Sequence, residues 1–134
     1  MRKIFFMILL FAVLALTACG TDDGVGAGAP PDVVPANFAG KTNPLGADAA
    51  AAGAEIYQAN CQSCHGIEGH GDGPSAAVLN PAPKNLAELQ AQVGDDYLFW
   101  RINTGKDGTA MVPWKGILTD EQIWQVVTFI RTLK

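Results

Sequence analysis

The sequence CQSCH at residues 61–65 places two thiols three positions apart, with an imidazole directly after the second one. Residues 49–60 are rich in alanine and contain no proline, so they favour a helix that runs straight into the first cysteine. Asp48 has the side chain of a helix N-cap and is predicted to start this helix. Residues 66–83 are rich in glycine and proline, which predicts a loop after the motif.

The order Cys-x-x-Cys-His, carried here by Cys61, Cys64 and His65, is the signature of covalent haem attachment. In such a site the two thiols add across the vinyl groups of one haem, and the adjacent imidazole coordinates the iron. One short segment then holds both the macrocycle and the metal. We therefore predict one haem c, bound covalently through Cys61 and Cys64, with His65 as an axial ligand.

Three other uses of this motif explain the sequence less well. A thioredoxin-like redox pair needs a strand before it and a helix after it, whereas a helix precedes and a loop follows residues 61–65. A zinc site needs a fourth ligand, and His70 is the only other imidazole in the chain. A disulfide between Cys61 and Cys64 would close so short a loop that it would add little stability.

Met111 is the candidate for the second axial ligand, because the other two methionines, Met1 and Met7, lie in the N-terminal segment 1–18, which is predicted to be removed as an export signal. A lone methionine is usually core filler, but Met111 lies among glycine, threonine and proline, where no helix face needs filling. Ligation by His and Met raises the reduction potential and closes the iron to small ligands, which suits electron transfer. His70 is the alternative ligand. It follows His65 by only five residues, so we expect it to be a solvated loop side chain.

The first 18 residues are predicted to be an export signal. A basic start is followed by an apolar run over residues 4–16, which is too short for a bilayer-spanning helix of about 20 residues. The following sequence LTAC at residues 16–19 resembles a bacterial lipobox, so we expect diacylglyceryl on Cys19, with a plain secretory signal as the alternative. Two or more acyl chains would hold the protein stably on a membrane. The chain would then be anchored on the periplasmic or extracytoplasmic side.

The chain has three cysteines, and exported proteins usually pair their cysteines in disulfides. Lipid on Cys19 and haem on Cys61 and Cys64 would use all three thiols, which favours both assignments together. Without residues 1–18 the chain has seven basic and 13 acidic side chains. This balance argues against a nucleic-acid partner and favours a docking partner with a basic face.

The rest of the sequence predicts a linker and a single helical domain. Residues 19–48 are rich in Gly, Ala, Pro and Asp and show no period, which indicates a flexible tether with an r.m.s. span of about 30 Å. Residues 49–134 form the predicted domain, without strand signals. Loops as long as those of this domain usually need a function or a ligand, and a haem would supply a hydrophobic centre for them. Further helices are expected at 86–93, at 95–103 and, after a capping box at 119–122, up to the chain end.

With its motif, late methionine and terminal helix, the domain resembles the class I cytochrome c family, whose first and last helices pack across each other. The matching positions of these two helices are Gly53, Tyr57, Cys61, Val126 and Phe129. The resemblance implies an all-α fold with helices packed around one covalently bound haem. It also implies that the carbonyl of Pro83, or alternatively that of Pro81, orients the imidazole of His65. The other implied haem contacts are packing by Trp100 and Trp114 and propionate contacts by Asn103 and Lys106.

The segments at 71–74 and 79–83, together with the lipobox and the tether, are similar to monohaem cytochrome subunits of bacterial respiratory or photosynthetic membrane complexes, including that of alternative complex III. The resemblance implies a one-electron carrier rather than an enzyme. Its partners would be a membrane quinol-oxidising complex and a downstream electron acceptor. The alternative is a haem enzyme or gas-sensing domain with an open distal site.

Overall fold

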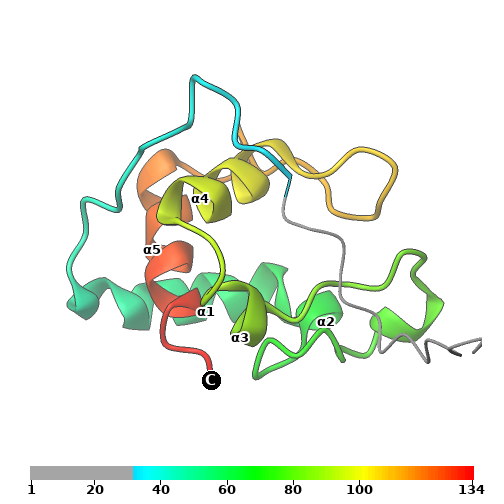
Figure 1. The fold of residues 1–134 in the computed structure, drawn as a ribbon. Coiled ribbons are helices and arrows are strands. Elements are labelled where there is room, and N and C mark those ends of the chain that lie inside the picture. The colour runs from blue at the N-terminus through cyan, green and yellow to red at the C-terminus, as the bar shows by residue number, and fades with distance from the viewer. Residues whose placement is uncertain (1–31) are drawn as a thin grey trace, which may run out of the picture. The chain divides into compact units, whose positions relative to one another are not determined.

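The computed structural model describes residues 32–134. The predicted signal at 1–18, the lipidation of Cys19 and the first part of the predicted linker lie outside the described residues. Figure 1 shows a helical fold in which an isolated bridge between Lys115 and Leu118 is the only β-type pairing of the described chain. The all-α prediction is therefore confirmed. The elements are η1 Ala47–Ala49, α1 Ala50–Asn60, α2 Gln62–His65, η2 Ala76–Val78, α3 Leu86–Leu89, α4 Asp95–Thr104 and α5 Asp120–Ile130.

Helices α1 and α5 cross each other and form the centre of the core (Figure 1). The crossing is close because Gly53 lies against the backbone of α5, where a Cβ would overlap the carbonyl of Gln125. One turn later the ring of Tyr57 packs on that of Phe129, with centroids 4.9 Å apart. The most deeply buried side chains of the core are Tyr57, Ile123, Val126 and Val127.

The capping box predicted at the start of α5 is present. Thr119 Oγ1 accepts a hydrogen bond from the backbone N–H of Gln122, and the Gln122 side chain accepts one from the backbone N–H of Thr119. The helix ends at Ile130 rather than at the chain end, and Leu133 then folds back into the core.

We expect Thr119→Ala to lower the free energy of unfolding by about 1 kcal/mol, because it leaves one N–H at the first turn of α5 without its acceptor. Denaturant unfolding would measure this as a lower midpoint at an unchanged slope. Thr119→Ser, which keeps the hydroxyl, should lose far less. Equal losses in the two variants would contradict a capping role for the hydroxyl.

Helix α4 agrees with its predicted range, whereas α3 is shorter than predicted. Helix α4 ends at Thr104 and is followed by Gly105, whose φ of 68° favours glycine. Phe99 of α4 stacks on Trp124 of α5 at 4.2 Å between centroids. Helix α3 is capped by Asn85, whose side chain accepts a hydrogen bond from the N–H of Glu88. The chain beyond residue 89 turns instead of continuing as a helix up to residue 93.

Residues 32–46, which we call the N-terminal arm, pack against the domain instead of forming a free linker. The ring centroids of Phe38 and Phe99 lie 6.3 Å apart. The N–H of Gly40 donates to Asp96 at 2.9 Å. Asn43 donates through its side chain to the carbonyl of Trp124 at 3.2 Å and to Thr128 Oγ1 at 2.9 Å. The arm was not foreseen because it is irregular and has no hydrophobic period.

The arm corrects two expectations about the start of the domain. The described residues 32–134 all belong to one compact unit, so the domain includes residues well before the predicted boundary at residue 49. Asp48 does not cap α1, because it lies inside the short turn η1, and the residue at the N-cap position is Ala49. Within residues 32–134, no helix is both long enough and apolar enough to cross a bilayer.

Candidate haem-binding site

A largely apolar cavity of about 390 Å³ opens between the CQSCH segment and the loop that follows α4. All five α-helices contribute side chains to it. Its volume lies in the range of about 300–1,000 Å³ typical of sites for cofactors and other small molecules. Such a cavity within a core this small supports the expectation that the loops pack around a ligand.

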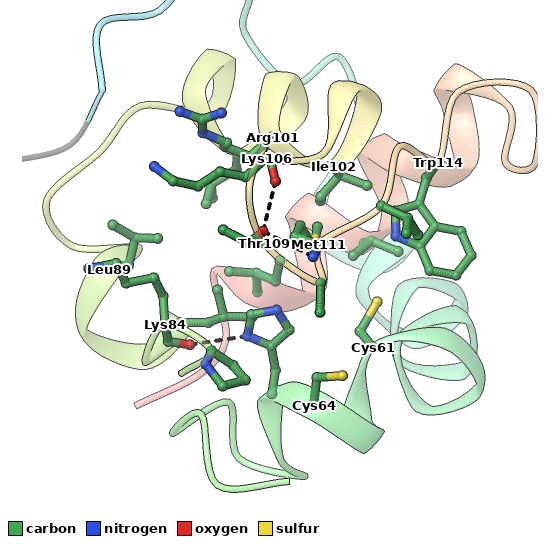
Figure 2. Close-up of a pocket in the computed structure, with 18 of the residues that line it drawn as sticks. Cys61, Cys64, Lys84, Leu89, Arg101, Ile102, Lys106, Thr109, Met111 and Trp114 are labelled. Atoms are coloured by element: carbon green, nitrogen blue, oxygen red, sulfur yellow. Dashed lines mark hydrogen bonds between the residues drawn. The ribbon is translucent and has the colours of Figure 1, made fainter. Parts of the chain in front are cut away.

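The two thiols of the motif meet at one end of this cavity (Figure 2). Cys61 directly follows α1 as its C-cap, and its backbone N–H donates to the carbonyl of Tyr57 at 2.8 Å. Cys64 lies in the single-turn helix α2 that follows. Burial raises the pKa of the Cys61 thiol to about 12, helped by the neighbouring Cys64, so Cys61 is a neutral thiol in the protein without its cofactor. Neither thiol is in a disulfide.

The imidazole of His65 is held in one orientation at the cavity wall. Its Nδ1 lies 3.1 Å from the carbonyl oxygen of Lys84, the contact marked by the dashed line at Lys84 in Figure 2. Burial lowers the pKa of His65, against the opposing effect of the Lys84 hydrogen bond. A neutral ring that donates from Nδ1 to a carbonyl has its Nε2 lone pair free for a metal.

The carbonyl that orients His65 belongs to Lys84 and not to Pro83 or Pro81, so the predicted role of Pro83 is wrong by one residue. Pro83 does line the cavity, but its carbonyl faces Gly71, where a Cβ would lie 2.5 Å from the oxygen. Gly71 has a φ of 78° and lets the two loops approach. Sequence alone could not resolve which of two adjacent carbonyls points at the ring.

Met111 reaches the same cavity from the loop after α4 (Figure 2). Its N–H donates to Thr109 Oγ1 at 3.1 Å, and its carbonyl accepts from the N–H of Lys106 at 2.9 Å. Thr109 also donates through Oγ1 to the Lys106 carbonyl at 2.8 Å. These bonds close a tight loop that fixes the backbone on both sides of Met111. The backbone that carries the Met111 side chain is therefore held by local hydrogen bonds and not only by packing.

His70, the alternative axial ligand, does not line the cavity. Its side chain is 40% exposed, and Nε2 lies 3.3 Å from the carboxylate of Glu68. The expectation of a solvated loop histidine agrees with this position. The cavity wall therefore contains one imidazole, His65, and one thioether, Met111.

The two predicted tryptophan contacts differ. Trp114 lines the cavity, whereas Trp100 does not. The side chains of α4 that face the cavity are centred between Leu98 and Arg101, and Trp100 points about 130° away from them at 100° per residue. The ring of Trp100 instead packs under the guanidinium of Arg101, 3.8 Å from its centroid. Asn103 is also off the cavity, while Lys106 lines it.

Sequence reasoning missed several residues of the cavity wall, most of all Arg101. Its neighbours in the wall, Tyr97, Leu98 and Ile102, are ordinary core residues at helical spacing, and their pattern contained no separate signal for a cofactor. The face of α4 that lines the cavity could have been identified from this spacing only if the side of the helix that packs against the core had been known. The ion pair of Arg101 with Asp32 joins residues 69 positions apart and could not have been found from the sequence.

These residues fit a covalently bound haem. Two thiols lie at one end of an apolar cavity, a neutral imidazole is oriented for coordination, and a thioether comes from a separate loop. When bound, haem supplies a one-electron couple between ferric and ferrous iron.

Comparisons with known proteins also indicate a haem-binding protein. The family model described as "Cytochrome C oxidase, cbb3-type, subunit III" matches residues 48–130. Cytochrome c6 of Synechococcus elongatus is 30% identical over 78 residues, which cover 58% of this chain and 83% of that protein. Cytochrome c6 of Thermosynechococcus vestitus is 31% identical over 78 residues, which cover 58% of this chain and 64% of that protein.

Two solved structures share the fold. The first is titled "Kuenenia stuttgartiensis reducing HAO-like protein complex Kustc0457/Kustc0458". It aligns with a TM-score of 0.58 at 26% identity over 68% of this chain, which spans about half, 47%, of the aligned chain. The second, "KustC0563 c-type cytochrome", aligns with a TM-score of 0.53 at 28% identity, covering 61% of this chain and 96% of that chain. The chain therefore belongs to the c-type cytochromes, as an all-α class I electron carrier with haem c bound covalently through Cys61 and Cys64.

Proposed function

We propose that this cytochrome carries one electron at a time on a haem whose iron is held by His65 and Met111, at the outer face of a bacterial membrane. The observation that carries the proposal is the position of Met111, which a closed loop holds in the same cavity as the oriented imidazole of His65. Imidazole with thioether leaves no free coordination position, so the site passes electrons and does not bind substrate.

Each residue of the site has a defined task in this proposal. Cys61 and Cys64 retain the cofactor through thioether bonds. Lys84 orients His65 through its carbonyl, and burial of the ring favours its neutral form. Trp114 covers part of the apolar wall beside Met111 and helps to exclude water. An apolar wall with few water molecules favours the less charged, reduced state of the haem and so raises its potential.

The electron-carrier proposal is tested by spectra of the isolated holoprotein. The oxidised protein should show the methionine-to-iron charge-transfer band, and the reduced protein should not bind carbon monoxide. Rapid carbon monoxide binding, with no charge-transfer band, would instead support a haem enzyme or a gas sensor with an open distal site.

We propose further that the mature chain begins at Cys19 and is held on the membrane by lipid on this residue. The proposal rests on the sequence at 16–19 and on the apolar run before it. Mass spectrometry of the mature N-terminus should show a diacylglyceryl cysteine. Cys19→Ser should appear unlipidated and outside the membrane fraction, whereas Cys19 with an unmodified thiol, or another mature start, would refute the anchor.

The proposed partners are a membrane quinol-oxidising complex, similar to alternative complex III, as electron donor and another redox protein as acceptor. The acidic balance of the chain favours partner surfaces with basic side chains. After mild detergent extraction, a subunit of such a complex should co-purify with it as a stable assembly. A protein that elutes alone, with its haem intact, would act as an independent carrier instead.

A further inference from the structure

The first described residue of the N-terminal arm, Asp32, pairs with two cations of the domain. One of its carboxylate oxygens accepts from both Arg101 and Lys106. Both cations also line the haem cavity. The arm therefore begins at the rim of the cofactor site, although Asp32 lies 69 positions before Arg101 in the sequence.

The pair of Arg101 and Lys106 is not fully satisfied by this one carboxylate. The guanidinium of Arg101 packs 3.8 Å over the ring of Trp100 and donates from Nη1 to the carbonyl of Gly105 at 3.4 Å, but its Nε is buried and has no hydrogen-bond partner. A buried donor without an acceptor is costly. Two positive charges face a single negative one, so the rim of an apolar cavity is left with a surplus positive charge.

The missing partner has the chemistry of a second carboxylate. Haem has two propionates, on the side of the macrocycle away from its two vinyl groups. Figure 2 shows Cys61 and Cys64 at one end of the cavity and Arg101 with Lys106 at the other. A haem bound through the two cysteines would therefore direct its propionates toward the two cations.

We propose that Asp32 and a haem propionate share the Arg101–Lys106 pair, so that the N-terminal arm is a strap whose docking tunes the potential of the haem. The proposal rests on the proposed haem site. In it Arg101 and Lys106 bind the propionate, and Asp32 is a positioning residue that reaches the cofactor only through them.

The rest of the arm holds Asp32 in place. Phe38 packs near Phe99, and the N–H of Asn43 donates to Asp95 at 3.2 Å. Hydrogen bonding to Lys106 lowers the pKa of Asp32 below its ordinary value, and Arg101 contributes in the same direction. The carboxylate is therefore charged at neutral pH. Docking of the arm therefore places one negative charge beside Arg101 and Lys106, at the end of the site proposed to hold the haem propionates.

The sign of the effect on the potential follows from charge. The ferric state has one more positive charge than the ferrous state, so a nearby anion stabilises the ferric state and lowers the potential. Asp32 also occupies cations that would otherwise neutralise the propionate, which acts in the same direction. Removing Asp32 or undocking the arm should thus raise the potential.

The test compares four forms of the full-length holoprotein: wild type, Asp32→Asn, Phe38→Ala and Glu55→Gln. Asp32→Asn removes the charge, and Phe38→Ala removes an apolar anchor of the arm. Glu55→Gln is the matched control, because it removes one negative charge from an exposed position of α1 that does not line the cavity. Redox titration gives the potential, and hydrogen exchange of residues 33–45 gives the docking of the arm.

We expect Asp32→Asn and Phe38→Ala to raise the potential and Glu55→Gln to leave it close to that of the wild type. The shift should shrink at high salt, because Asp32 is partly exposed. Faster exchange in the arm should accompany the shift in Phe38→Ala. An undocked arm with an unchanged potential, or equal shifts in Asp32→Asn and Glu55→Gln, would refute the strap. Haem content and the methionine-to-iron band are recorded on the same samples, so a failure of the haem site is recognised separately.

Discussion

Replacing Met111 with alanine is expected to lower the reduction potential of the haem and to let the reduced protein bind carbon monoxide. The thioether favours ferrous over ferric iron, and its loss leaves one coordination position open. Each tenfold preference for ferrous iron corresponds to about 59 mV in a one-electron couple, so a drop of at least this size is expected. The methionine-to-iron band should disappear in the same variant, while haem content stays unchanged because Cys61 and Cys64 are intact.

Two controls separate ligation from disturbance of the loop. Met111→His should restore a closed iron that ignores carbon monoxide, at a lower potential than the wild type. Val112→Ala changes the neighbouring cavity-lining residue and should keep the methionine-to-iron band. If Met111→Ala kept the band and excluded carbon monoxide, Met111 would not be the ligand. The iron would then be closed by another side chain of the wall, with Lys84 and Lys106 as the available amines.

Gly53→Ala should destabilise the protein, although alanine is a better helix former than glycine. A Cβ at this position would overlap the Gln125 carbonyl and lie 3.0 Å from the Cβ of Phe129, so α1 and α5 would have to move apart. Overpacking of this kind typically costs about 1–3 kcal/mol, against a gain of about 1 kcal/mol from helix propensity. Gly53→Val adds two more carbons without a comparable gain in helix propensity and should cost more. Denaturant unfolding of the holoprotein measures both.

The matched control is an exposed position of the same helix. Gln58 lies on the solvent side of α1, so Gln58→Ala should change the free energy of unfolding by no more than about 0.5 kcal/mol. Equal stability of Gly53→Ala and the wild type would mean that the two helices do not approach each other as closely as the backbone contact at Gln125 requires.

Features set by local sequence were predicted well. The helix before Cys61, the range of α4 and the capping box of α5 all follow from residues within a few positions of each other. The cofactor was predictable for the same reason, since the haem attachment motif spans only five residues. The roles of His65 and Met111 as axial ligands stay predictions, although the structure places both at one cavity.

Features that depend on contacts between distant segments were predicted poorly. Lys84 rather than Pro83 orients His65, in a region where the loop at Gly71 packs closely against residues 83–84. The family resemblance implied a haem contact for Trp100, yet the rotation of α4 in the core turns this side chain away from the cavity. Neither the approach of two loops nor the rotation of a helix can be predicted from the composition of the loop or helix alone.

By itself, the sequence determined the covalent cofactor and the helical class, because motif spacing and helical period are local properties of the chain. It also singled out Met111 as the candidate for the second axial ligand. Only the tertiary structure decided that residues 32–46 belong to the domain and that Asp32 meets Arg101 and Lys106. An arm rich in small residues has the composition of a free linker, and the partner of an apolar anchor such as Phe38 is Phe99 of α4, which is distant in the sequence. The CQSCH motif therefore identified the haem, but the folded chain determined which residues surround it.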